Sequence, residues 1–346
     1  MHHTLITARE EIKMGLERFF AGPGEGLLHL PPWGEDLGRR LAEYAGRGKL
    51  LRGAMVPFSL RLFRPDDASH AAAAVQAGVA MELMQSFLLI HDDIMDQDDV
   101  RRGGPSVHAQ YARTLDSQQY GISMGICAGD VAAFLAVEQM ATLPVPEELR
   151  NRLTALFARE IVAVGLAQMQ DVHHGYVERA SREAVMQVYT WKTGRYTFSL
   201  PLMTGALLAD AAPSQVDALA GFGEAIGRIF QIRDDQLGLF GTSEVIGKPA
   251  GSDIRENKKT IFRELLLERI GDGDPVRGLF GAATVSDGEL KQVREALVKT
   301  GVLKDVDTVV EQERQFAEKA ISSLTLGAAE EEALRSLLQY NLDRTV

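Results

Sequence analysis

The sequence contains a single cysteine, Cys127, among 346 residues. One thiol can form neither a disulfide framework nor a site of several thiolates, so we expect a protein of the reducing cytoplasm whose fold depends on its core. Cys127 itself is expected to be a small core residue. β-Branched residues in alternating runs are scarce, which weighs against a β-sheet protein.

Positive charge is also in short supply, because 37 Lys and Arg stand against 48 Asp and Glu, a net charge of −11. This balance disfavours nucleic acid as a partner, and phosphate binding would need local cations or metal ions. We find no apolar run of about 18 residues and therefore expect no transmembrane segment. The first segment of the chain has neither an apolar stretch nor a small-residue cleavage site, so we expect no signal peptide.

Helix-forming residues dominate the chain, of which 45% is hydrophobic and 25% charged. No Gly/Ser-rich linker divides it, so we predict one all-α domain over residues 1–346, a single large helical bundle. The predicted helices cover residues 4–21, 34–46, 50–64, 68–98, 105–116, 121–141, 146–175, 179–194, 196–210, 213–240, 257–270, 286–299, 303–322 and 327–342.

Two aspartate pairs follow apolar helical segments far apart in the sequence. Asp92 and Asp93 follow FLLIH, and Asp234 and Asp235 follow FQIR. Asp96 lies four residues after Asp92, on the same helix face and near a helix C-terminus, where both like charge and the helix dipole are unfavourable. A solvated acidic helix end would explain one such cluster. Two clusters instead indicate facing helices of a bundle around a central cavity that binds a divalent cation.

Cationic residues follow both aspartate pairs. Arg101 and Arg102 come after the first pair, and Lys248, Lys258 and Lys259 come after the second. Arginine and lysine in such positions suit the oxygens of a diphosphate, which Mg²⁺ commonly binds together with one or two carboxylates. The pattern therefore predicts a site for a metal-bound polyphosphate.

These segments resemble the motifs of trans-type polyprenyl diphosphate synthases, and are most like those of the short-chain geranylgeranyl and farnesyl diphosphate synthases. HDDIMDQDDVRRGG resembles the first aspartate-rich motif of the family, and FQIRDDQLGLFG followed by GKPAGSDIRENKKT resembles the second. GKLLRGAM, AQMQDV and WKTGRYTF resemble three further segments of the family, in the same order along the chain. Each motif is weak alone, but together they are highly specific.

The chain departs from the family pattern at four positions. Gly53 stands where a proline usually follows Arg52, and Ala167 replaces the glycine before Gln168. Gly238 replaces the third aspartate of the second motif, so position 238 has no metal ligand. Gln85 occupies a place where many members carry histidine.

The resemblance implies an isoprenoid synthase-like fold and Mg²⁺-dependent condensation of isopentenyl diphosphate with an allylic diphosphate, with three ions per site and a homodimer. It assigns the metal to Asp92, Asp93, Asp96, Asp234 and Asp235. It assigns the allylic diphosphate to Arg101, Lys192 and Lys248, and isopentenyl diphosphate to Lys49, Arg52, Gln85 and Arg102, and it counts Lys258 among the substrate-binding residues. Thr193, Gln168 and Gln231 would stabilise the carbocation or orient ligands, and Asp171 completes the AQMQDV motif. Asp92, Asp96, Asp234, Lys192, Lys248 and Arg101 form the predicted catalytic set.

The side chains upstream of Asp92 are expected to limit the length of the product. Positions one to three helical turns back are Phe87 and Leu88, then Met84, then Met81, at about 5.4 Å per turn. By resemblance, Phe87 with a non-aromatic Leu88 favours a C20 product, geranylgeranyl diphosphate. Phe87 could equally be an ordinary core residue of the bundle.

Other functions remain open from the sequence. Farnesyl or longer diphosphates are alternative products, and a class I terpene cyclase shares the first aspartate motif. The pair His91-Asp92 is also compatible with an HD-type metal phosphohydrolase, although that leaves the second cluster unused. A non-catalytic partner subunit is disfavoured because both clusters and the candidate phosphate-binding lysines are present.

Overall fold

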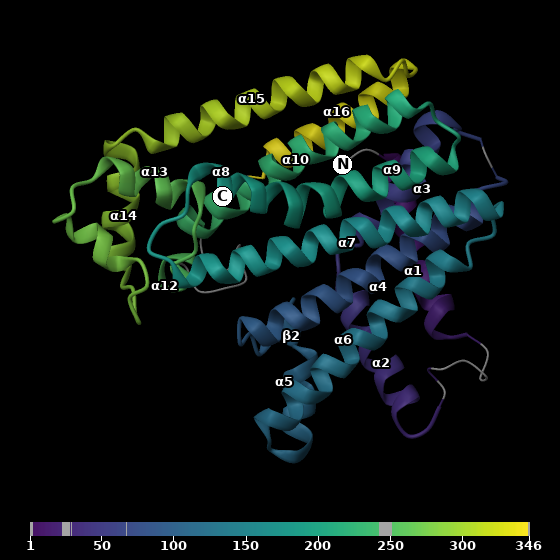
Figure 1. The fold of residues 1–346 in the computed structure, drawn as a ribbon, viewed down its shortest axis with the longest axis horizontal. Coiled ribbons are helices and arrows are strands. Elements are labelled where there is room, and N and C mark those ends of the chain that lie inside the picture. Colours follow the sequence, from purple (N-terminus) through teal and green to yellow (C-terminus); the bar gives the residue numbers. More distant parts are fainter. Residues whose placement is uncertain (1–2, 23–27, 29, 67, 242–250, 345–346) are drawn as a thin grey trace. The chain divides into compact units, whose positions relative to one another are not determined.

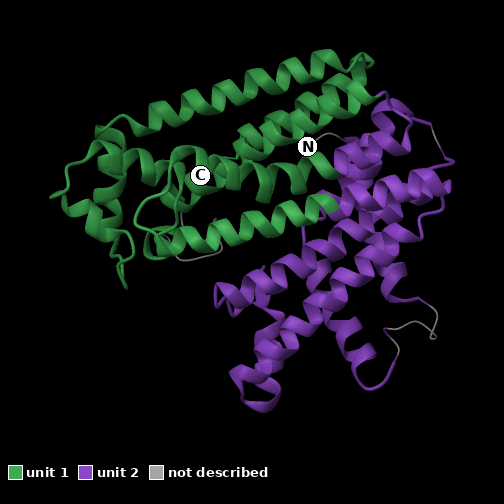
Figure 2. Cartoon of the chain, in the orientation of Figure 1, with its two compact units in different colours: residues 1, 159–200, 213–346 green, residues 2–158, 201–212 purple. Residues whose placement is uncertain are grey.

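The computed structural model describes residues 3–22, 28, 30–66, 68–241 and 251–344. The described residues are almost entirely helical, which confirms the all-α prediction (Figure 1). The chain divides into two compact units, coloured separately in Figure 2. Unit 1 comprises residues 1, 159–200 and 213–346, and unit 2 comprises residues 2–158 and 201–212. That the whole chain is one domain stays a prediction.

Unit 2 is organised around the long apolar helix that ends at the first aspartate pair. That helix, α4, packs against α1, α3 and α6. The unit also contains most of α9 and the first part of α7. Its elements are α1 (His3–Phe20), α2 (Trp33–Gly46), α3 (Leu51–Phe63), α4 (Ala71–Met95), β1 (Val100–Arg101), β2 (Gly104–Pro105), α5 (Val107–Leu115), α6 (Gln118–Ala141), α7 (Glu147–Tyr176) and α9 (Leu200–Leu208).

Unit 1 is organised around α10, which ends shortly after the second aspartate pair. α10 packs against the π-helix η2, against α15 and against α16. Figure 1 shows α15 and α16, in yellow-green and yellow, running along α10. The elements of the unit after α7 are α8 (Arg182–Val188), η2 (Tyr189–Ser199), α10 (Pro213–Phe240), α12 (Ser252–Arg255), α13 (Ile261–Arg269), η3 (Pro275–Leu279), α14 (Asp287–Lys299), α15 (Val302–Ser323) and α16 (Ala328–Leu342).

Local capping signals explain several helix starts. The side chains of Ser181, Thr260 and Ser286 each accept a hydrogen bond from a backbone N–H of the first turn, and Ser286 forms a capping box with Glu289. Such bonds satisfy amides that the helix itself leaves without partners. The predicted boundaries of these helices accordingly lie close to the observed ones, except that the segment 257–260 is not helical.

The predicted helix break at residue 195 is wrong. The chain continues without a break from α8 through η2 into α9. A Cβ atom on Gly194 would lie 3.0 Å from the backbone of Glu224 in α10, so tertiary packing favours glycine inside this helical segment. The sequence also failed to predict the antiparallel hairpin β1–β2, in which Val100 pairs with Pro105 and Arg101 with Gly104.

The expectation that Cys127 lies in the core is wrong, whereas the expectation of no transmembrane segment stays a prediction. Helices α4 and α6 are long and apolar enough to cross a membrane by length and composition, although 72% of the apolar window of α4 is buried, as in a core helix. In α6, 39% of the corresponding apolar window is buried. Cys127, expected in the core, is exposed on α6, as are Ile126 and Phe134. The apolar face of α6 is therefore uncovered in the single chain.

Candidate functional site

The first aspartate pair lies in the last turn of α4. The Asp93 side chain is fully buried, and both of its carboxylate oxygens accept hydrogen bonds, from Tyr44 Oη at 2.7 Å and Arg101 Nε at 2.5 Å. Burial raises the pKa of Asp93, and the Arg101 charge and the Tyr44 hydrogen bond only partly oppose it. The Asp92 side chain is 20% exposed. Asp92 is thus the member of the pair that offers oxygens to a ligand, while Asp93 is held by the protein.

Arg101 connects the aspartates of this cluster. Besides Asp93, its guanidinium group lies 3.3 Å from Asp98 and 3.9 Å from Asp92. Asp96 caps the C-terminus of α4 and is exposed. Arg101, which the sequence assigns to the allylic diphosphate, is therefore engaged with carboxylates in this structure, and its role toward a substrate stays a prediction.

Three of the four residues predicted to hold isopentenyl diphosphate lie at or beside the start of α3. Lys49 is exposed and Arg52 is half-buried in the first turn of α3. A Cβ atom on Gly48 would lie 2.6 Å from Arg102 Nη1, so the Arg102 guanidinium rests against the loop that carries Lys49. Gln85, on α4, is 6% exposed. The β1–β2 hairpin and the loop before α3, about 50 residues apart in sequence, thus form one cationic surface.

The proposed floor residues differ in their burial. Phe87 and Leu88 are half-buried, whereas Met84 is 3% exposed and Met81 is fully buried. The Phe87 ring packs edge-on against the His91 ring, with centroids 4.7 Å apart. His91 Nε2 lies 3.2 Å from the Ile126 carbonyl oxygen of α6. The His91 imidazole therefore anchors α4 to α6, which does not favour the HD-type metal site.

The second aspartate pair lies near the end of α10 and repeats the pattern of the first. Asp235 is 1% exposed and accepts hydrogen bonds from the Tyr189 hydroxyl and from Gln231 Nε2, the latter at 3.0 Å. Burial raises the pKa of Asp235 to about 6, although Lys258, 3.7 Å away, opposes the rise. The Asp234 side chain is 34% exposed, and its Oδ1 lies 2.5 Å from an Arg344 guanidinium nitrogen.

Residues from η2 and α7 extend this second cluster. Thr193 Oγ1 donates to Gln231 Oε1 at 3.0 Å, which links Thr193 through Gln231 to Asp235. Lys192 Nζ forms a 2.7 Å ion pair with Asp171 of α7. Burial raises the pKa of Asp171, but the charge and hydrogen bond of Lys192 hold it below the ordinary value. Gln168 is half-buried one turn before Asp171.

Asp253 lies next to Gly238, the position at which the second aspartate-rich motif usually has its third aspartate. A Cβ atom on Gly238 would lie 2.6 Å from Asp253 Oδ2, so any larger residue at this position would require the Asp253 carboxylate to shift. Burial lowers the pKa of Lys258, but the negative charges of Asp253 and Asp235 hold it above its ordinary value. Lys248, the remaining predicted phosphate ligand, lies outside the described residues.

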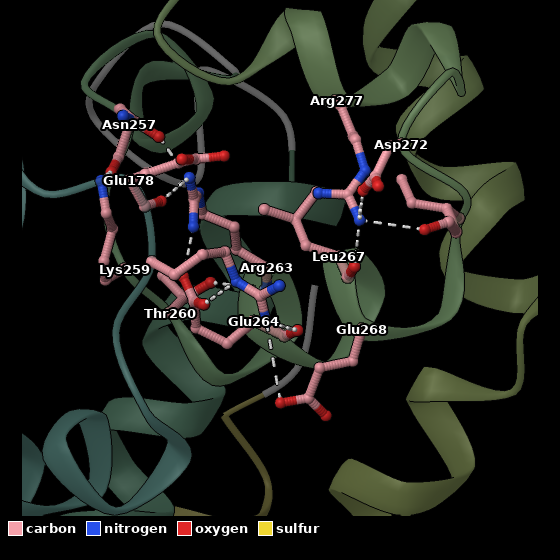
Figure 3. A network of polar contacts seen from close by, with 12 residues as sticks. Glu178, Asn257, Lys259, Thr260, Arg263, Glu264, Leu267, Glu268, Asp272 and Arg277 are labelled. Carbon is pink, nitrogen blue, oxygen red and sulfur yellow. Dashed lines mark hydrogen bonds and ion pairs between the residues drawn. The ribbon is translucent and has the colours of Figure 1, made fainter.

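A buried polar network, drawn in Figure 3, supports the segment that carries Lys258. The Arg263 guanidinium donates to Glu264 Oε1, to Asn257 Oδ1 at 3.1 Å and to the Glu178 carbonyl oxygen at 3.0 Å. Arg179 Nε also donates to Glu264, at 2.8 Å. Since Arg263 and Glu264 are nearly inaccessible, this network ties residues 257–264 to the segment that follows α7.

The sequence reasoning missed three residues of these clusters. Tyr44, Tyr189 and Arg344 contact the aspartates but lie 49, 46 and 110 residues from the residues they contact. No motif spacing connects such distant positions. Within the described residues, no group of three His, Cys, Asp or Glu side chains is arranged to hold a metal ion by itself.

Comparison with known proteins adds an independent finding. The family model described as "Polyprenyl synthetase" matches residues 35–297. The chain is 30% identical over 308 residues to a geranylgeranyl diphosphate synthase of Sulfolobus acidocaldarius, with 88% of each protein covered. It is 34% identical over 227 residues to a geranylfarnesyl diphosphate synthase of Natronomonas pharaonis, covering 66% of this chain and 62% of that one.

A solved structure supports the same relationship. The crystal structure of a geranylgeranyl pyrophosphate synthase from Corynebacterium glutamicum, complexed with isoprenyl diphosphate and magnesium, has a TM-score of 0.86 to this chain. The two sequences are 26% identical, and the alignment covers 99% of this chain and 98% of the other.

Proposed function

This chain belongs to the polyprenyl synthetase family and is a prenyltransferase, and we propose that it condenses isopentenyl diphosphate head-to-tail with allylic diphosphates to give geranylgeranyl diphosphate. The observation that carries the proposal is the repeated aspartate pair. In each pair one carboxylate is partly exposed. The other is buried and contacts a tyrosine hydroxyl and a cationic side chain. We propose that both pairs act on one allylic diphosphate.

Magnesium ions suit the residues of these clusters. Asp92, Asp96 and Asp234 each present carboxylate oxygens to solvent, and Mg²⁺ commonly takes one or two carboxylates together with substrate phosphates. We assign the metal to these three residues and propose three ions per site. The buried residues Asp93 and Asp235 support these ligands. When bound, Mg²⁺ neutralises the negative charge of the departing diphosphate.

The cationic side chains of the chain have separate tasks in this proposal. Lys192, Lys248, Lys258 and Arg101 bind the allylic diphosphate oxygens, which favours departure of the diphosphate as an anion. The hydroxyl oxygen of Thr193 and the side-chain amide oxygens of Gln168 and Gln231 carry partial negative charge and stabilise the allylic carbocation that remains.

Isopentenyl diphosphate has no allylic leaving group and needs no metal to bind. Lys49, Arg52, Arg102 and Gln85 hold it in our proposal, so that its double bond attacks the carbocation. The new C–C bond forms, and the C–H bond next to the resulting cation breaks to restore a double bond. The proton passes to the released diphosphate. Water has to be excluded, because it would trap the carbocation as an alcohol.

The product length is proposed from the side chains upstream of Asp92. Phe87 and Leu88 are half-buried, one turn before the aspartates, and the buried Met84 and Met81 lie further upstream along α4. An aromatic ring resists displacement by a growing tail more than a methionine does, because methionine has three flexible side-chain bonds. We therefore propose Phe87 as the floor, with a C20 product.

The function is tested by incubating the purified full chain with isopentenyl diphosphate, an allylic starter and Mg²⁺. We expect diphosphate release and a longer prenyl diphosphate only when all three are present. Diphosphate release from the allylic substrate alone, with a cyclic hydrocarbon product, would indicate a terpene cyclase. Phosphate release from a single substrate would indicate a phosphohydrolase.

The floor is tested by chromatography of the dephosphorylated products. Phe87→Ala is expected to lengthen the main product by at least one C5 unit, because it removes the ring that ends the cavity. Leu89→Ala is the matched control, since it also shortens a half-buried side chain of the same helical turn. A dominant product of C30 or longer from the wild-type chain would contradict the floor.

We propose that two copies of the chain form a homodimer through the exposed apolar face of α6. This face comprises Ile126, Cys127, Val131, Phe134 and Val137, of which Phe134 is 74% exposed. Exposed apolar patches of this kind commonly mark protein interfaces, and a second copy would bury the patch. A molar mass of one chain in solution would contradict this proposal.

A further inference from the structure

The carboxylate of Glu82 lies buried at the N-terminus of α3, although Glu82 belongs to α4. Glu82 is 4% exposed and accepts the Gly53 backbone N–H at 2.8 Å. The backbone N–H of Arg52 also interacts with it. Leu50, the residue before α3, makes no capping bond with its own side chain. Glu82 therefore caps α3 from a neighbouring helix, where a negative charge also suits the helix dipole.

Gly53 is the residue that makes this arrangement possible. A Cβ atom on Gly53 would lie 2.7 Å from the Gly78 carbonyl oxygen and 3.0 Å from the Glu82 side chain. The two glycines thus let α3 and α4 approach closely enough for the hydrogen bond. A proline at position 53, the residue more usual in the sequences that this segment resembles, has no N–H to donate.

The positive charges of Arg52 and Arg102 act on the Glu82 carboxylate. Burial raises the pKa of Glu82, and the Gly53 N–H together with the positive charges of Arg52 and Arg102 oppose the rise. An ionised carboxylate is tolerated in a protein interior only when such partners compensate for the lost water. Arg52 lies in the first turn of α3, next to the Gly53 N–H that Glu82 accepts, and Arg102 lies in the β1–β2 hairpin, so the charge of one carboxylate attracts two separate cationic segments.

We propose that Glu82 is a positioning residue for isopentenyl diphosphate. Its carboxylate fixes the first turn of α3 and holds the guanidinium groups of Arg52 and Arg102 toward a common diphosphate. Glu82 does not touch the substrate. The proposal rests on the proposed function, because it assumes that Arg52 and Arg102 bind isopentenyl diphosphate, and it adds the group that orients them.

The test separates the two substrates in steady-state kinetics. Glu82→Gln keeps the side-chain volume and removes the charge. We expect the KM for isopentenyl diphosphate to rise about tenfold, with the KM for geranyl diphosphate and kcat changed by no more than about twofold. Equal changes in both KM values, or no change in either, would overturn the proposal.

Ser59→Ala is the matched control for lost stability. Ser59 is fully buried on the same helix, and its Oγ donates to the Leu202 carbonyl oxygen at 2.6 Å. We expect this variant to lower the melting temperature without raising the KM for isopentenyl diphosphate. If Ser59→Ala raises that KM as much as Glu82→Gln does, general loosening of α3 explains the effect and the positioning role is wrong.

A binding measurement covers the case in which Glu82→Gln does not fold. Glu82→Asp keeps the charge but shortens the side chain by one methylene group. Calorimetric titration of isopentenyl diphosphate into the Mg²⁺-free full chain should show an affinity about threefold weaker than wild type. Unchanged affinity overturns the positioning role. A wild-type chain that makes no prenyl product overturns the proposed function instead, so the two failures are distinguishable.

Discussion

The two aspartate clusters are built alike but supported differently. In each, the second aspartate is buried and hydrogen-bonded to a tyrosine, Tyr44 in unit 2 and Tyr189 in unit 1. In unit 2 the cation is Arg101, only 8 residues after Asp93 in the adjoining hairpin. In unit 1 the exposed aspartate contacts Arg344, which is 110 residues away at the end of the chain.

The two clusters therefore differ in which parts of the chain supply the groups that compensate the charge of each carboxylate. The cation of the first cluster lies in the short hairpin that follows α4, and its tyrosine, Tyr44, lies on α2. The second cluster depends on α10, η2, the segment before α13 and the chain end. We therefore expect the second cluster to be more sensitive to changes far away in the sequence.

The largest effect is expected from replacing the exposed aspartates. Asp92→Asn and Asp234→Asn should each lower kcat/KM by about 10²–10³, because each removes a ligand for the charge that neutralises the leaving group. Their melting temperatures should change little. Prenyl product formation and thermal unfolding measure the two quantities on the same samples.

The buried aspartates serve as the controls for this experiment. Asp93→Asn and Asp235→Asn remove the buried negative charge that Arg101 or Lys258 compensates, and should cost roughly 3 kcal/mol of unfolding free energy. If Asp92→Asn is as active as wild type, or if all four variants lose the same stability, the division into exposed ligand and buried support is wrong.

A smaller effect is expected from the tyrosines. Tyr189→Phe and Tyr44→Phe each remove a hydrogen bond to a buried carboxylate, at a cost of about 1–3 kcal/mol. Tyr189→Phe should cost more, because its hydroxyl also accepts the Ile261 backbone N–H at 3.1 Å. Urea unfolding measures both values. Equal losses would mean that the two clusters depend on their tyrosines to the same extent.

The smallest effect is expected at the chain end. Arg344→Ala removes the ion pair to Asp234, worth about 1 kcal/mol, and should lower the Mg²⁺ concentration for half-maximal activity roughly three- to fivefold. Arg335→Ala is the control, because its partners on α15 and α16 are Glu318 and Glu331. A higher Mg²⁺ requirement after Arg344→Ala would show that Arg344 assists ligand binding instead of competing with it.

The helices and the identity of the two clusters could be predicted from local sequence. Apolar periodicity and capping residues such as Ser286 act within one or two turns, so a single segment contains the information. The predicted segments around Lys192 and Asp171 are joined in the structure by an ion pair, and those around Thr193 and Gln231 by a hydrogen bond. The roles of these residues in binding and catalysis stay predictions.

The errors arose where tertiary contacts outweighed local preference. Cys127 has the composition of a core position but lies on the exposed face of α6. The helical path through Gly194 continues because α10 packs against it, although glycine alone disfavours a helix. Neither fact can be read from the neighbouring residues.

Residue types at short and fixed spacings were enough to predict the all-α fold, the two aspartate pairs and the family. The buried member of each pair, and the distant tyrosine, arginine or lysine that compensates its charge, became known only from the folded chain. Burial and ion pairing depend on distances in space between segments that are far apart in the sequence. The hydrogen bond from the Gly53 backbone N–H to Glu82 is the clearest example.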